Sequence, residues 1–185
     1  RYFASEWDDI TVAFPVNILE VDTINDLILS RDKLQLNLLV ENTEAMEFLE
    51  NSISSSVGIY IKIDVGYGRT GIPVHQTDKI DGILKLLKRS KTLQFLGFLS
   101  HAGHSYYCRS KEEIYDVFQK SRDGMISLKQ QYISKFPDLQ LSFGDTPCCS
   151  VIDPKEFQVF DEIRPGNFVF YDLEQASIGS CEMNS

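Results

Sequence analysis

Four short polar segments of the chain combine glycine with residue types that bind or move charge. They carry arginine, histidine, threonine and asparagine, and each follows an apolar run that is typical of a β-strand. In parallel sheets, ligands bind at the carboxyl ends of the strands, because the loops there vary while the scaffold stays packed. Each segment alone could be an ordinary turn, but recurrence after four successive strands favours a binding edge. The segments are residues 64–71, 100–107, 142–147 and 164–167.

The first segment holds one arginine, Arg69, within a G-x-G-x-x-G spacing. The glycines are Gly66, Gly68 and Gly71. A dinucleotide-binding loop would open directly into a helix, with an acidic residue about 20 positions later. Here Pro73 follows at once, which argues against that fold. The spacing favours a tight loop that fixes Arg69 as a cation pointing into the site, and an exposed loop arginine is the alternative.

Lys62 precedes this loop on a strand whose other face is apolar. Tyr60, Lys62 and Asp64 alternate with isoleucines, so they share one strand face. A lysine in a central strand is costly to desolvate unless it is paired, and barrel interiors are where such lysines meet ligands or counter-charges. We therefore expect Lys62 either to pair with Asp64 or to act as a Schiff-base amine.

His101 and His104 form an H-x-x-H pair after another strand. At a strand end, a three-residue step rarely points both imidazoles at one metal ion, and no cysteine is spaced to complete a zinc site. We therefore predict no metal site in this chain. His101, the last residue of its strand, is expected to face a ligand, whereas His104 is equally well explained as a histidine held by the backbone.

Alternating strand and helix patterns position these residues. The apolar β-branched runs are typical of parallel strands buried on both faces. Helical stretches begin at capping residues such as Thr43 and Thr77 and then show 3.6-residue periodicity. The expected strands are residues 9–14, 34–41, 58–64, 94–101, 139–143 and 157–163, and the expected helices are residues 23–30, 43–53, 77–87 and 111–134.

The order of elements predicts an α/β fold and a single domain over residues 1–185. About six βα units in 185 residues match the module size of a (β/α)₈ barrel, which is typically about 250 residues long. We therefore predict a TIM-type barrel in which about six of the eight units are present. A doubly wound open sheet, which accommodates six strands without a gap, is the alternative.

Composition excludes several classes of partner. The net charge of −9 repels nucleic-acid backbones and anionic lipid. The apolar runs are far shorter than the roughly 20 residues that span a bilayer, and no signal peptide opens the chain, so we predict a cytoplasmic protein. Without a zinc-type pair, the cysteines are expected to be buried reduced thiols. They are Cys108, Cys148, Cys149 and Cys181.

Taken together and in this order, the motifs resemble the N-terminal barrel of fold-type III pyridoxal-phosphate enzymes. The resemblance is to the D-threonine aldolase and D-serine dehydratase-like group, related to alanine racemases, and it covers residues 9–180. It implies pyridoxal 5′-phosphate as cofactor, a small amino-acid substrate and a homodimer in the intact protein. The motifs are KIDVGYGRTG (62–71), GFLSHAGHSY (97–106), SFGDTP (142–147) and EIRPGNFVFYDLEQ (162–175).

The resemblance also implies a phosphate site. The Thr146 hydroxyl and the main-chain N–H groups of Gly166 and Asn167 would hold the cofactor phosphate, a role that suits hydroxyls and exposed N–H groups. We expect these groups to lie on one concave patch, with Arg69 and His101 across the lumen.

Further roles concern the cofactor ring and the reaction. Lys62 and Arg69 match a lysine–arginine pair on the phenolic side of the cofactor, and Arg164 is similar in place to the residue near the ring nitrogen. His101 would face the pyridine ring. His101 and Tyr106 are the catalytic candidates, and Tyr171 completes the cofactor-binding set.

One departure from the family is central. The Schiff-base lysine of the family lies on the first barrel strand in a motif of the type RPHxKTHK, which this sequence lacks. The family's C-terminal β-domain, which supplies the metal ligands, is also missing, so a divalent metal is expected only in the intact protein. The chain resembles the middle of such an enzyme, incomplete at both ends and inactive by itself.

The predicted activity of the intact protein is that of a lyase on D-amino or 3-hydroxy amino acids. An amino-acid racemase and a non-catalytic cofactor- or anion-binding barrel remain alternatives. A further alternative is a lyase acting on sugar phosphates with Lys62 as its amine, which would share the phosphate site at the late strands.

Overall fold

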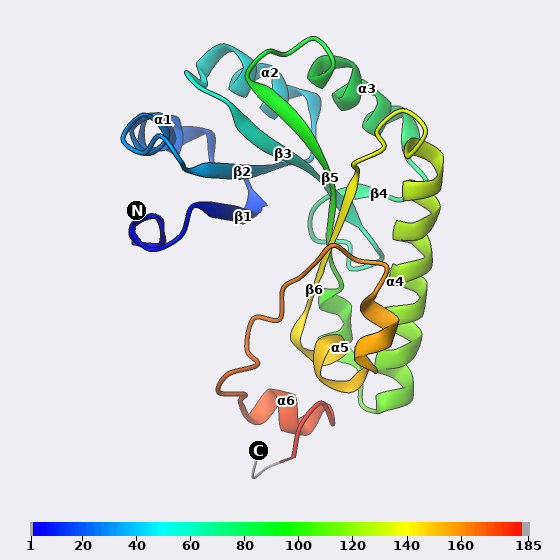
Figure 1. Cartoon of the computed structure of the whole chain (residues 1–185). Coiled ribbons are helices and arrows are strands. Elements are labelled where there is room, and N and C mark those ends of the chain that lie inside the picture. Colours follow the sequence, from blue (N-terminus) through cyan, green and yellow to red (C-terminus); the bar gives the residue numbers. More distant parts are fainter. Residues whose placement is uncertain (1, 183–185) are drawn as a thin grey trace. The chain divides into compact units, whose positions relative to one another are not determined.

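The computed structural model describes residues 2–182, in which strands alternate with helices (Figure 1). The hydrogen-bonded strand order is β1-β2-β3-β5-β6-β7, and β4 pairs with β3. The chain divides into two compact units: residues 2–62 with 70–97, and residues 63–69 with 98–182. Strands β3 and β5 begin in the first unit and end in the second.

The first unit holds the N-terminal strands and three helices. Strands β1, β2 and β3 pair in parallel, as expected for strands linked by helices. Its elements are η1 (Phe3–Ser5), β1 (Asp9–Pro15), η2 (Ile18–Glu20), α1 (Val21–Leu29), β2 (Gln35–Val40), α2 (Thr43–Ser52), most of β3 (Val57–Asp64), β4 (Ile72–Pro73), α3 (Thr77–Leu87) and the start of β5 (Leu93–His101).

The core of the first unit consists of the apolar side chains of its central strands and of the apolar faces of its helices. Strands β2 and β3 are buried along nearly their whole length, because their β-branched and leucine side chains fill both faces. Helices α2 and α3 pack against each other. Their apolar positions recur at helical spacing and are buried at Met46, Leu49, Ile80, Ile83, Leu84 and Leu87.

A buried asparagine links the first three strands. The Asn37 amide donates hydrogen bonds to the side chains of Asp9 (2.8 Å) and Thr11 (3.2 Å) on β1. On the other side of Asn37 lies Gly58 of β3, where an added Cβ would come within 2.3 Å of Asn37 Oδ1 and 2.4 Å of Leu96 Cδ1. Glycine is therefore required at position 58, because the side chains of Asn37 and Leu96 leave no room for a Cβ.

The second unit contains the longest helix and the carboxyl ends of the late strands. Strands β6 and β7 pair in parallel. Besides the ends of β3 and β5, its elements are η3 (Gly103–Tyr107), α4 (Lys111–Tyr132), β6 (Gln140–Gly144), α5 (Thr146–Val151), η4 (Pro154–Phe157), β7 (Glu162–Ile163) and α6 (Leu173–Ser177).

Helix α4 and a cluster of phenylalanines form the core of this unit. Ser110 caps the helix by accepting the N–H of Glu113, and its buried side chains recur every three or four residues. Phe118 of α4 lies 4.8 Å from Phe157 and 5.6 Å from Phe143, measured between ring centroids. Phe143 stacks on Phe160 at 4.9 Å, which completes the cluster.

Most predicted elements are confirmed, but the sixth strand is wrong. The sequence predicts a strand over residues 157–163, whereas the structure has η4 up to Phe157 and only Glu162–Ile163 as strand. Asp153 caps a tight turn there by accepting the N–H of Lys155. Phe157 and Phe160 are then buried in the phenylalanine cluster. Their packing there takes the place of the strand pairing that the sequence predicted.

Two predicted helix caps are also wrong, and two helices were not predicted. Asn42, one residue before Thr43, caps α2 by accepting the N–H of Ala45 at 2.8 Å. Thr77 is the first helical residue of α3, and no side chain caps that helix. Helices α5 and α6 lie outside the four helices expected from the sequence.

Within residues 2–182, no helix has both the length and the apolar character needed to cross a membrane.

Candidate functional site

The polar segments lie where the sequence places them, at the carboxyl ends of strands. Asp64 ends β3, His101 ends β5, Gly144 ends β6 and Ile163 ends β7. All four strand ends belong to the second unit. The binding edge can therefore be described within that unit, whereas Lys62 belongs to the first.

The predicted phosphate-binding residues come together. The Thr146 hydroxyl accepts a hydrogen bond from the main-chain N–H of Asn167 at 2.8 Å, across 21 residues of sequence. Gly166 lies against the same hydroxyl, because a Cβ there would be 3.9 Å from Thr146 Oγ1. Thr146 itself is fully buried. The structure thus joins the loop after β6 to the loop after β7.

Asp145, next to Thr146, holds a buried carboxylate. It caps α5 by accepting the N–H of Cys148 at 2.6 Å through Oδ1, whereas Oδ2 is buried without a hydrogen-bond partner among the described residues. Burial raises the pKa of Asp145 to about 6, although Cys148, the neighbouring Ser105 hydroxyl and Arg164 oppose the shift. A carboxyl group that can change charge near neutral pH therefore adjoins the predicted phosphate loop.

Tyr171 ties the C-terminal segment to α5. Its hydroxyl lies 2.9 Å from the Ser150 hydroxyl, which itself donates to the Thr146 carbonyl at 2.7 Å. Since the single Ser150 hydrogen is used for that carbonyl, Tyr171 is the donor to Ser150. Tyr171 has a φ of 49°, a left-handed conformation that is uncommon for a bulky residue. The tyrosine is thus fixed beside the predicted phosphate loop.

Arg164 is held by the ends of β5 and β6. Its Nη2 donates to the Ser100 carbonyl at 2.6 Å, and its Nε donates to the Ser142 hydroxyl at 2.7 Å. The Ser142 hydroxyl in turn bonds to Glu162, whose carboxylate lies 3.7 Å from Arg164 Nε. Gly144 permits this arrangement, since a Cβ there would come within 2.6 Å of the Arg164 carbonyl oxygen.

His101 has a defined ring orientation. Its Nδ1 lies 2.7 Å from the Gly144 carbonyl oxygen, which can only accept, so Nδ1 carries the hydrogen. His104 is half-buried, and burial lowers its pKa, although Asp64 opposes the shift. The backbone role considered for His104 is not seen, because its Nδ1 is buried without a partner among residues 2–182.

The loop after β3 is tight, as its glycines predict. The Asp64 carboxylate accepts the N–H groups of Gly66 (3.0 Å) and Gly68 (3.1 Å), and both glycines have positive φ. Arg69, which is exposed, places its guanidinium 5.0 Å from the centre of the Tyr67 ring. The Tyr67 ring, which Arg69 contacts, also lies 5.9 Å from the ring of His101.

The remaining predicted residues have the following positions. Lys62 is buried in β3, 4% exposed, as is Tyr60 on the same strand face. Tyr106 lies half-buried in η3, and its carbonyl accepts a 3.4 Å hydrogen bond from Arg109. The cofactor-binding role of Lys62 and the catalytic role of Tyr106 stay predictions.

The cysteines are free, but only some match the prediction of burial. Cys108 and Cys148 are buried, whereas Cys149 and Cys181 are partly exposed. Burial raises the pKa of Cys149 to about 11, so its thiol is a poor nucleophile at neutral pH. No three metal-ligating side chains among the described residues gather as a metal site would require.

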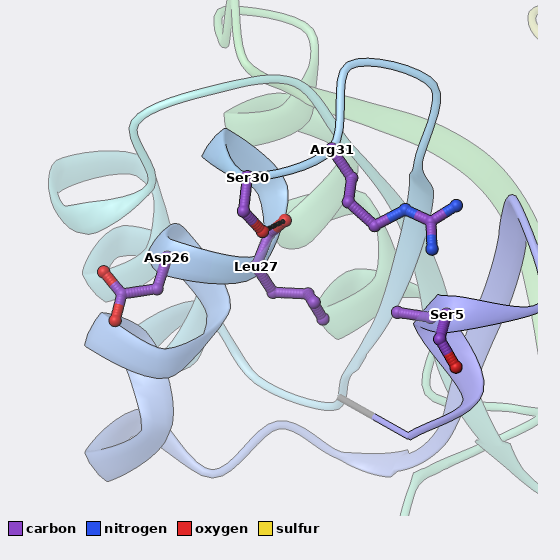
Figure 2. Close-up of a pocket in the computed structure, with 6 residues that line it drawn as sticks. Ser5, Asp26, Leu27, Ser30 and Arg31 are labelled. Atoms are coloured by element: carbon purple, nitrogen blue, oxygen red, sulfur yellow. Dashed lines mark hydrogen bonds between the residues drawn. The ribbon is translucent and has the colours of Figure 1, made fainter.

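A pocket of about 490 Å³ in the first unit is lined by none of these residues. Figure 2 shows its lining between η1 and α1. Its polar side chains are already bonded: Ser30 donates to the Leu27 carbonyl at 2.9 Å, Arg31 pairs with Asp8 at 2.8 Å, and Ser5 donates to the Tyr2 carbonyl. We therefore place the candidate site at the strand ends of the second unit.

Three features of this site are not among the residues predicted from the sequence. They are the ring of Tyr67, the carboxylate of Asp145 that caps α5, and the Ser142–Glu162 pair that supports Arg164. Of these three features, only the Asp145 cap could be predicted from the sequence. Asp followed by Thr-Pro is typical of a helix N-terminus with proline in its first turn.

Comparison with known proteins identifies relatives of this chain and structures that share its fold. The alanine racemase N-terminal domain matches residues 5–174. D-serine dehydratase of Dictyostelium discoideum is 29% identical over 99% of this chain and 49% of its own length. The structure of D-threo-3-hydroxyaspartate dehydratase from Delftia sp. HT23 matches with a TM-score of 0.84 and 24% identity, over 98% of this chain and 48% of the other.

A second structural likeness is to D-threonine aldolase from Filomicrobium marinum, with a TM-score of 0.74 at 16% identity over 95% of this chain and 47% of the other. The chain spans about half the length of the relatives it matches. These likenesses confirm the predicted α/β barrel of the alanine racemase N-terminal kind, present in part, over the doubly wound alternative. The match over residues 5–174 establishes that the chain belongs to the alanine racemase N-terminal domain family.

Proposed function

We propose that the intact protein is a pyridoxal-phosphate enzyme that acts on D-amino or 3-hydroxy amino acids, as a D-serine dehydratase- or D-threonine aldolase-like lyase. The observation that carries this proposal is the hydrogen bond between Thr146 and Asn167, with Gly166 beside it. It joins the two late-strand loops that commonly bind phosphate in barrels of this kind. Two relatives that match the chain are named dehydratases, which favours a lyase over the racemase alternative.

The residues at this junction fit a phosphate group. Among the described residues, the Thr146 hydroxyl has no acceptor for its own hydrogen, so it can donate to a phosphate oxygen. The Asn167 N–H, now bonded to that hydroxyl, can turn to the same anion. Gly166 leaves the main chain uncovered, since the nearest atom to a Cβ there is the Thr146 oxygen. Hydrogen bonds to an anion are about twice as strong as neutral ones, which favours the exchange.

The remaining site residues fit a charged aromatic ring. When bound, pyridoxal phosphate supplies an electron-withdrawing ring that stabilises negative charge at the substrate carbon. Arg164, fixed by Ser100 and Ser142, would hold positive charge at the ring edge. His101 would present an imidazole whose tautomer is set by Gly144, and Arg69 a cation for anionic groups. These groups bind and orient, and His101 is the candidate for holding a proton.

Some of the machinery lies outside these residues. The basic motif that carries the family's Schiff-base lysine is not among the 185 residues, so covalent attachment is assigned to another part of the intact protein. The same holds for a divalent metal. We keep the homodimer as a prediction, and we expect residues 1–185 alone to be inactive.

A titration with two ligands tests the proposal. The intact protein is titrated with pyridoxal phosphate and with pyridoxal, which lacks the phosphate, as wild type, Thr146→Val and the control Thr146→Ser. Losing a charge-assisted hydrogen bond should weaken pyridoxal phosphate binding by about tenfold or more in Thr146→Val and leave pyridoxal binding unchanged. Thr146→Ser should resemble the wild type. Equal weakening for both ligands, or for neither, would contradict the phosphate assignment.

A further inference from the structure

Tyr67, which has no role in the sequence-based predictions, lies at the centre of a cluster of rings and charges. Its ring stacks on His104 at 6.4 Å and meets His101 edge-on at 5.9 Å, measured between centroids. The Arg69 guanidinium carbon lies 5.0 Å from its centre. Tyr107 lies 6.2 Å away, and a hydrogen bond that its hydroxyl donates to Tyr67 raises the pKa of Tyr107. All these residues belong to the second unit.

The Tyr67 ring packs directly against a glycine. It rests on Gly103 at the start of η3, where an added Cβ would come within 2.4 Å of Cε1 and 2.6 Å of Cδ1 of Tyr67. Real Cβ atoms do not approach carbon this closely, so glycine at position 103 is what allows the ring to lie there. The contact with Gly103 and the two neighbouring histidines restrict where the ring can lie.

The Arg69 guanidinium lies over the Tyr67 ring. Among the described residues, no carboxylate pairs with Arg69, and the guanidinium is exposed. A free arginine side chain has many rotamers, and ordering it opposes binding of any anion that it would hold. A cation over the face of a fixed tyrosine is attracted by the ring quadrupole, which restricts those rotamers.

We propose that Tyr67 is a positioning residue of the candidate site: its ring, seated on Gly103 beside His101, holds the Arg69 guanidinium ready for an anionic group of the bound cofactor or amino acid. This inference rests on the proposed function. Tyr67 does not itself bind the anion. It acts through Arg69, by lowering the entropy that the arginine loses on binding.

A double-mutant cycle tests this role in the intact protein. Pyridoxal phosphate affinity is measured for the wild type, Tyr67→Leu, Arg69→Gln and the double variant, with thermal melting to confirm folding. Loss of a cation–π contact corresponds to about a 3- to 30-fold change, depending on desolvation. Tyr67→Leu should weaken binding within that range. Because Tyr67 acts through Arg69, the double variant should bind no more weakly than Arg69→Gln alone.

Two further variants separate positioning from a general structural effect. Tyr67→Phe keeps the ring and loses the hydroxyl, so it should bind like the wild type. Gly103→Ala leaves Tyr67 chemically intact but displaces its ring, so it should weaken binding like Tyr67→Leu and have no additional effect in the Tyr67→Leu background. Gly103→Ala also keeps the test valid if Tyr67→Leu fails to fold.

The possible outcomes are distinct. Wild-type affinity in Tyr67→Leu, or a Tyr67→Leu effect that persists in full in the Arg69→Gln background, overturns the positioning role and leaves the proposed function intact. A wild-type protein that does not bind pyridoxal phosphate overturns both.

Discussion

Replacing Asp145 with asparagine should give a protein whose stability, relative to the wild type, rises with pH. Asp145 is 1% exposed, and its Oδ2 has no partner among the described residues. Burial therefore raises its pKa from 3.8 to about 6. An amide keeps the acceptor that caps α5 through the Cys148 N–H, but it carries no charge at any pH.

The sign and size of the effect follow from proton linkage. Because the folded-state pKa lies above the unfolded one, the contribution of Asp145 is fully favourable below about pH 4 and is lost as the pH rises through about 6. A shift of about two units corresponds to about 3 kcal/mol. The stability of Asp145→Asn relative to the wild type should thus rise by about 3 kcal/mol between about pH 4 and about pH 7.

Urea unfolding of both proteins across this pH range measures the difference. An unpaired amide N–H in the variant would add a constant offset at every pH, so the change with pH is the quantity that matters. Asp153→Asn is the matched control, because Asp153 caps η4 in the same way but is exposed. A stability difference for Asp145→Asn that does not change with pH would refute the reasoning.

Other predictions concern packing, capping and the phosphate site. Phe118→Ala should lower the free energy of unfolding by about 3–5 kcal/mol in urea titrations, because the residue is fully buried in the phenylalanine cluster; a loss below about 1 kcal/mol would contradict that packing. Asn42→Ala should destabilise by about 1 kcal/mol and Thr43→Ala by clearly less, and the reverse order in thermal melts would restore Thr43 as the cap. Gly58→Ala should be strongly destabilising because of the contact with Asn37, which a normal melting temperature would disprove. Gly166→Val should weaken inorganic phosphate binding, measured by calorimetry, by a few kcal/mol at most, and unchanged binding would remove Gly166 from the site.

Elements with strong periodicity could be predicted from the sequence. Helix α3 has the predicted bounds, residues 77–87, and strands β2, β3 and β5 differ from prediction by one residue at most at each end. In these segments local preference and burial agree: isoleucine-rich runs become buried strands, and apolar residues three and four apart face the core. Parallel topology follows because each strand is connected to the next by a helix.

The features that could not be predicted from the sequence depend on contacts between residues that are distant in the chain. Residues 157–163 contain enough apolar residues for a strand, but Phe157 and Phe160 join a cluster whose other members lie on α4 and β6. The position of Tyr67 depends on Gly103, which is distant in sequence and looks like any other loop glycine. The proximity of Thr146 and Gly166 could be predicted, because parallel strands bring their carboxyl ends to the same edge of a sheet.

A crystal structure of the intact protein with pyridoxal phosphate tests the central claim most directly. We predict the phosphate within hydrogen-bond distance of the Thr146 hydroxyl and of the main-chain N–H groups of Gly166 and Asn167, with His101 and Arg164 against the ring. A phosphate bound elsewhere, for example at Arg31 in the pocket of the first unit, would contradict the account.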